Sequence, residues 1–244
     1  MHRSGTSLVA AWLERCGLPI HAGCFIQGSL GNPKGHFEDA DFVSLHSSAT
    51  LRQVPDSWGW KVLSGGSVEL SSEDELRARS LIRHRNTKYA VWGWKDPRTI
   101  LYLADWKRIL PGLKVFCVWR PCSDVVASLV RRSRHSDNEM VKITAPQALR
   151  LWLSYNSRLR QYAQDHPAGT LLLHIEDVVR RDREVIGVLN DRFGTRISFR
   201  PIHNVYDESL WRGASNSLWK CVRIHPAVRC LERTLRDLSE LSSR

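Results

Sequence analysis

Short apolar runs alternate with segments of helical periodicity along this chain, and this alternation restricts the fold more than any other feature. Residues 89–94, 114–119 and 170–175 are rich in apolar side chains, so each run predicts a buried strand. Strands that alternate with helices usually pair in parallel and are covered by those helices. We therefore predict an α/β fold, a three-layer sandwich with a mainly parallel central sheet, in one domain over residues 1–244. The predicted helices cover residues 5–16, 39–50, 71–86, 101–110, 146–165, 182–193 and 226–242, and a further helix that begins at residues 120–124 carries Ser128, Arg131 and Arg132.

Basic residues give the 244-residue chain a formal net charge of +11, so its surface attracts anions. Nucleic acid, an anionic membrane, an acidic glycan and an anionic cosubstrate would all satisfy this charge. No apolar run of the sequence approaches the ~20 residues that cross a bilayer, so no membrane span is expected. The six cysteines lack the spacing of a zinc site, so no metal is expected.

A small-residue loop leads directly into the first predicted helix, 5–16. The loop consists of Arg3, Ser4, Gly5, Thr6 and Ser7. The first N–H groups of a helix have no partner within the helix, and the helix dipole favours a negative charge there. The hydroxyl groups and the Arg3 guanidinium add further donors, so the loop predicts an anion site. It lacks the lysine of a Walker A motif, which argues against an ATP-hydrolysing P-loop enzyme.

Two further basic motifs follow predicted strands. Lys95 opens the sequence K-D-P-R directly after residues 89–94, and Arg120 directly follows residues 114–119. Ser128 stands eight residues after Arg120, two turns into the next predicted helix. The carboxyl ends of parallel strands lie at one edge of a sheet, where ligands bind. An arginine fork with a serine hydroxyl suits a phosphate group, whereas Lys95 could instead be a surface lysine at the end of a strand.

A polar loop with the sequence N-P-K-G-H-F-E precedes the predicted helix 39–50. Glu38 in this loop is a candidate general base, because burial and neighbouring charges can raise the pKa of a carboxylate. His36 is the alternative base, since its ordinary pKa of about 6.5 needs no adjustment. A structural role for Glu38 is also open, either as the cap of the following helix or as a partner of Arg3.

The order of these motifs resembles that of sulfotransferases that use 3′-phosphoadenosine 5′-phosphosulfate (PAPS), in particular the bacterial and carbohydrate-type branch, with similarity to the tyrosylprotein sulfotransferases. The resemblance implies that the first loop binds the 5′-phosphosulfate, that Lys95 lies against the transferring group, and that Arg120 and Ser128 hold the 3′-phosphate. It also implies a P-loop-like fold and no metal. The cosubstrate ligands implied in this way are Arg3, Ser4, Gly5, Thr6, Ser7, Lys95, Arg120, Ser128, Arg132 and Arg212.

The resemblance implies transfer of a sulfuryl group from PAPS to an acceptor hydroxyl or amine. Glu38 or His36 would accept the proton, while Lys95 and Arg3 would stabilise charge. A carbohydrate is the first expectation for the acceptor, followed by a small alcohol, and we expect a cytoplasmic protein without a specific nucleic-acid partner. Two alternatives stay open: a catalytically impaired basic protein that binds nucleotide, nucleic acid or acidic glycan, and a P-loop kinase-like enzyme.

The first loop of such enzymes follows a central parallel strand, whereas here Met1 already belongs to the loop. We therefore expect a sheet that lacks its first strand, in a chain truncated at its N-terminus relative to the family pattern.

Overall fold

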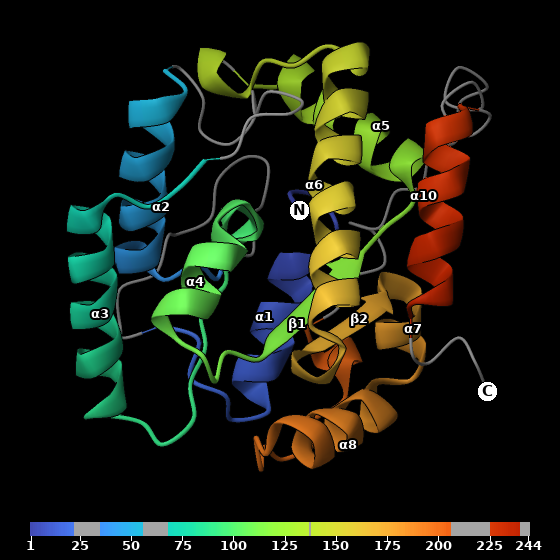
Figure 1. Cartoon of the computed structure of the whole chain (residues 1–244). Helices are drawn as coiled ribbons and strands as arrows, with labels where there is room; N and C mark the ends of the chain where they lie inside the picture. Colours follow the sequence, from blue (N-terminus) through green and yellow to red (C-terminus); the bar gives the residue numbers. More distant parts are fainter. Residues whose placement is uncertain (22–34, 56–67, 137, 206–224, 240–244) are drawn as a thin grey trace.

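The computed structural model of the chain describes residues 1–21, 35–55, 68–136, 138–205 and 225–239 (Figure 1). The described part is mainly helical, and the predicted helices are confirmed with shifts of a few residues at their ends. Short 3₁₀ segments cover Pro97–Tyr102, Glu139–Val141, Pro167–Gly169 and Ile202–Asn204. The α-helices are α1 (Thr6–Arg15), α2 (Ala40–Gln53), α3 (Ser72–Asn86), α4 (Leu103–Ile109), α5 (Cys122–Arg134), α6 (Ala145–Asp165), α7 (Ile175–Arg180), α8 (Asp182–Phe193) and α10 (Pro226–Asp237).

Local capping explains where several of these helices begin. Ser71 and Asp74 form a capping box at the start of α3, and Thr144 with Gln147 forms another at the start of α6. The Asp39 carboxylate accepts the N–H of Asp41 at the start of α2. The side chains therefore pair N–H groups that the first turns would otherwise leave without partners.

Two strands form the sheet in the described part of the chain, β1 (Val115–Trp119) and β2 (Thr170–His174). They pair in parallel, with Val115 opposite Thr170 and Trp119 opposite His174. The predicted strands at 114–119 and 170–175 are thus confirmed. The second ends earlier than expected, because the His174 ring caps the helix that starts at Ile175.

The prediction of a strand at residues 89–94 is wrong. This segment is irregular, and the Gly93 N–H donates to the Pro19 carbonyl at 2.9 Å rather than to a neighbouring strand. A strand requires the edge of another strand for its hydrogen bonds. Within the described part of the chain this segment pairs with no strand, so its aromatic and β-branched composition does not produce strand pairing.

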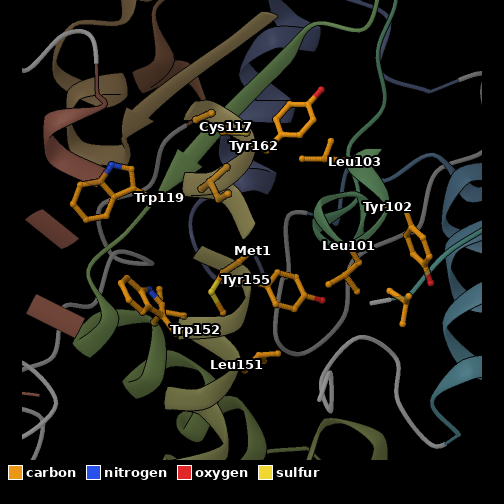
Figure 2. Packing of buried hydrophobic residues seen from close by; sticks show 14 of the residues in the cluster. Met1, Leu101, Tyr102, Leu103, Cys117, Trp119, Leu151, Trp152, Tyr155 and Tyr162 are labelled. Atoms are coloured by element: carbon orange, nitrogen blue, oxygen red, sulfur yellow. The ribbon is translucent and has the colours of Figure 1, made fainter. Parts of the chain in front are cut away.

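Apolar side chains from the two faces of the sheet pack into two separate clusters. Cys117 and Trp119 of β1 pack with residues of α5, α6 and α10, whereas Val118 and Leu171 pack with residues of α1 and α8. This division follows from the alternation of side chains along a strand. Figure 2 shows the first cluster, with Trp119 among its labelled residues. The described chain is thus a mixed α/β structure, and its wider three-layer arrangement stays a prediction.

None of the helices among the described residues is both long and apolar enough to cross a membrane.

Candidate functional site

The loop that enters α1 has a backbone that requires glycine at residue 5. Gly5 is the N-cap of α1 and has a φ of 88°, in the left-handed region. A Cβ atom at this position would lie 2.7 Å from two side-chain atoms of Ile175, the first residue of α7. Arg3 also has a positive φ, of 63°. The loop is therefore packed tightly against the start of α7.

Replacing Gly5 by alanine is expected to lower the free energy of unfolding by about 2–4 kcal/mol, from the left-handed backbone together with overpacking against Ile175. Gly17→Ala is the matched control, because Gly17 has a φ of +98° but no atom within 4 Å of its added Cβ. Its expected cost is only about 1–2 kcal/mol. Urea denaturation of the two variants measures the difference, and equal losses would contradict the tight contact with Ile175.

A cluster of arginines surrounds this loop. The Arg3 Nε atom donates to the Ser128 hydroxyl at 2.9 Å, which joins the first loop to α5. Burial, followed by the nearby charges of Arg132 and Arg120, lowers the pKa of Arg3 to about 10. Burial also lowers the pKa of Arg120, whose Nε atom lies 3.6 Å from an Asp124 carboxylate oxygen. Like charges brought together in this way form a site that an anion would stabilise.

Ser4 gives a second sign of a site at this loop. Ser4 is fully buried, and its hydroxyl oxygen has no hydrogen-bond partner among the described residues. A buried hydroxyl without a partner is uncommon, because desolvation costs free energy that a hydrogen bond would offset.

Lys95 brings three separate parts of the chain together. Its Nζ atom donates to the Ser7 hydroxyl at 3.1 Å, to the His36 carbonyl at 2.8 Å and to Glu38 Oε1 at 2.7 Å. The side chains of Lys95 and Glu38 are each 12% exposed. Lys95 is therefore not a surface lysine. The cap of α2 is Asp39, and Glu38 forms its ion pair with Lys95 rather than with Arg3.

Burial sets the protonation behaviour of this group. It raises the pKa of Glu38 and lowers that of Lys95, although their ion pair opposes both shifts. Burial also lowers the pKa of His36 to about 4, with further contributions from Lys95, Arg132 and Arg3. His36 is therefore neutral at pH 7, and Glu38 is a carboxylate with a stronger affinity for protons than an exposed one.

A buried network beneath Lys95 was missed by the sequence reasoning. An Asp96 carboxylate oxygen lies 2.8 Å from Arg98 Nη2 and 3.0 Å from His46 Nδ1. The Trp106 indole N–H donates to His46 Nε2 at 2.9 Å, so the His46 proton is on Nδ1 and is donated to Asp96. The K-D-P-R motif contained Asp96 and Arg98, but His46 lies on the apolar face of α2 and gave no signal.

The structure brings most of the predicted residues into two adjoining groups. Arg3, Arg120, Ser128 and Arg132 are linked by contact or by charge, and Ser7, Lys95, His36 and Glu38 are linked by the contacts of Lys95. Thr6 is the first residue of α1. Arg212 lies outside the described residues. Among the residues that are described, no group of three or more His, Cys, Asp or Glu side chains could hold a metal ion.

Comparison of the chain with protein-family models, curated proteins and solved structures finds no match in any of the three.

Proposed function

We propose that this protein transfers a sulfuryl group from PAPS to an acceptor hydroxyl or amine. The observation that carries the proposal is the set of contacts made by Lys95, which joins the first loop at Ser7 to the polar loop at His36 and Glu38. The reaction needs cations around the leaving phosphate and a base near the acceptor, as phosphoryl transfer does. Lys95 is a cation beside the first loop, and it also contacts Glu38, the proposed base.

The residues around the first loop fit the two anionic ends of the cosubstrate. The N-terminus of α1, with the unpartnered Ser4 hydroxyl, suits the 5′-phosphosulfate. Arg120 and Ser128 suit the 3′-phosphate, and the hydrogen bond from Arg3 to Ser128 ties the two halves of this site together. A bound polyanion would also relieve the repulsion among Arg3, Arg120 and Arg132.

Separate roles follow for Lys95 and Glu38. Lys95 would stabilise the charge that develops on the bridging oxygen of the leaving phosphate. Glu38 would accept the proton of the acceptor, because burial raises its pKa and because its contact with Lys95 uses Oε1, which lets Oε2 face the acceptor. A carbohydrate hydroxyl or a small alcohol is the proposed acceptor. With this function we propose the finer fold, a P-loop-like three-layer sandwich.

Binding of 3′-phosphoadenosine 5′-phosphate (PAP) tests the cosubstrate directly. A ligand present at 100 times its Kd stabilises the folded protein by about 2.7 kcal/mol, which corresponds to a rise of roughly 5–11 °C in melting temperature for a chain of this size. We expect this rise with PAP, a much smaller one with 5′-AMP, which lacks the 3′-phosphate, and none specific to ATP with Mg²⁺.

Arg120→Ala is expected to abolish the preference for PAP over 5′-AMP. Arg79→Ala is the matched control, because Arg79 is an exposed arginine of α3 and its loss removes the same charge. Equal stabilisation by PAP and 5′-AMP would contradict a 3′-phosphate site. An equal loss of the preference for PAP in Arg120→Ala and Arg79→Ala would mean that the preference depends on net charge and not on Arg120. Stabilisation by PAP without turnover of PAPS would favour a nucleotide-binding protein over an enzyme.

A further inference from the structure

Two helices from later in the chain hold the turn between β1 and α5, which carries Arg120. The Arg120 carbonyl accepts the indole N–H of Trp152 in α6 at 3.1 Å. Two residues later, the Cys122 N–H donates to Glu232 Oε1 of α10 at 2.8 Å. The backbone of the turn is therefore fixed from outside, at Arg120 itself and at the first residue of α5.

The contact from Glu232 takes the place of a local helix cap. The N-cap residue of α5 is Pro121, which makes no side-chain hydrogen bond to the helix. The first N–H groups of a helix have no partner within it, and the helix dipole favours a carboxylate there. Glu232 brings that carboxylate from 110 residues further along the chain. Burial raises the pKa of the Cys122 thiol and the Glu232 charge adds to the shift, which agrees with a carboxylate close to the start of α5.

Apolar side chains attach α10 to the rest of the chain. Val228, Leu231 and Leu235 are buried and belong to the same cluster as Trp119 of β1. The helix packs against α6 and β2 (Figure 1). Burial of three apolar side chains supplies most of the free energy of such docking. The Glu232 contact therefore serves the start of α5 rather than the attachment of α10.

The position of this turn sets where Arg120 and Ser128 lie. The Arg120 residue is buried, so its guanidinium has few alternative directions. Ser128 is buried too and lies within α5, so it moves with that helix. The bidentate contact of an arginine with a phosphate depends on geometry, and a displacement of about 1 Å can remove much of its effect. A shift at the start of α5 would therefore displace both groups of the proposed 3′-phosphate site.

We propose that Glu232 is a positioning residue for the 3′-phosphate: it caps α5 from α10 and so holds Arg120 and Ser128 where the phosphate binds. This inference rests on the proposed function, because it assigns the cap to binding of the cosubstrate. Glu232 acts through the backbone of α5. Its loss is therefore expected to reduce the preference for a 3′-phosphate more than the binding of the nucleotide as a whole.

The test compares two substitutions of Glu232. Glu232→Ala removes the cap, whereas Glu232→Gln keeps an oxygen that can accept the Cys122 N–H. Asp237→Ala is the matched control, because Asp237 is the exposed last residue of α10. Isothermal titration of PAP and of 5′-AMP into each variant gives two Kd values, whose ratio isolates the 3′-phosphate. We expect Glu232→Ala to reduce the preference for PAP by about tenfold, Glu232→Gln by less than about threefold, and Asp237→Ala by no measurable amount.

Hydrogen exchange tests the cap without any ligand. The Cys122 amide is expected to exchange at least about tenfold faster in Glu232→Ala than in the unmodified chain, while the amides of α3 keep their rates. Unchanged exchange at Cys122 would overturn the cap. Equal weakening of PAP and 5′-AMP in Glu232→Ala would overturn the positioning role, because a general loosening of the fold would affect both nucleotides alike.

The remaining outcomes separate this inference from the proposed function. A full preference for PAP in Glu232→Ala would overturn the positioning role and leave the 3′-phosphate site intact. A loss in Glu232→Gln as large as in Glu232→Ala would overturn the hydrogen-bonded cap as the cause. Equal binding of PAP and 5′-AMP by the unmodified chain would overturn the 3′-phosphate site, and this inference with it.

Discussion

Replacing Asp96 by alanine is expected to lower the free energy of unfolding by about 3–5 kcal/mol, a large part of the 5–15 kcal/mol that stabilises a typical domain. The change leaves the buried Arg98 guanidinium without its carboxylate partner. It also removes the acceptor for the His46 Nδ1–H group, whose other ring nitrogen is held by Trp106. Both groups are enclosed, so water cannot easily replace the lost carboxylate.

Asp165→Ala provides the control for the same loss of charge. Asp165 is exposed at the end of α6 and accepts from Gln161, so its replacement is expected to cost less than about 0.5 kcal/mol. Urea unfolding at pH 7 measures both variants. A loss below 1 kcal/mol for Asp96→Ala would mean that Arg98 finds other partners, such as the Ser47 hydroxyl with which it already has a hydrogen bond.

The same network predicts a contribution to stability that depends on pH. Burial alone would raise the pKa of Asp96, but Arg98 and His46 hold it well below its usual range. A carboxylate whose pKa is lower in the folded chain than in the unfolded chain stabilises the fold above the unfolded value of about 3.9. This contribution is lost as the pH falls below about 4. Asp96→Ala should therefore show a shallower loss of stability between pH 4 and pH 2.

The sequence was informative where a local pattern determines the structure. Apolar runs predicted β1 and β2, and the helix predicted at residues 71–86 coincides with α3. The same patterns failed at residues 89–94, because composition reports burial whereas a strand also needs an edge to pair with. Edges are set by packing of distant segments, and a single sequence does not reveal them.

The candidate site could also be predicted only in part, because local sequence patterns do not set contacts between distant segments. Parallel-strand geometry predicted that the motifs at Lys95 and Arg120 would share one edge of a sheet, but residues 89–94 form no strand, so Lys95 does not follow one. Its contacts are instead with the two loops that contain Ser7 and Glu38. The choice of partner was not predictable, because 57 residues separate Lys95 from Glu38 and only tertiary packing sets their distance. His46 gave no signal for the same reason: its role depends on what surrounds α2.

Glu38→Gln is expected to lower kcat by a factor of about 10²–10⁴, while the Kd for PAP changes by less than about threefold. Glutamine keeps the shape of the side chain and an oxygen that can accept the Lys95 Nζ–H bond, but it cannot take the proton of an acceptor. Release of PAP from PAPS, measured with a panel of methyl glycosides and primary alcohols, gives kcat, and thermal shift gives the Kd.

Glu73→Gln controls for the change in charge, because Glu73 is exposed in the first turn of α3. A turnover loss in Glu38→Gln that comes with a matching loss of PAP binding would make Glu38 a structural partner of Lys95. Unchanged turnover would assign the proton to another group. His36→Gln is then the decisive variant, because the His36 ring has a pKa of about 4 and is neutral and able to accept a proton at pH 7. The Glu38→Gln and His36→Gln variants together distinguish a carboxylate base from an imidazole base.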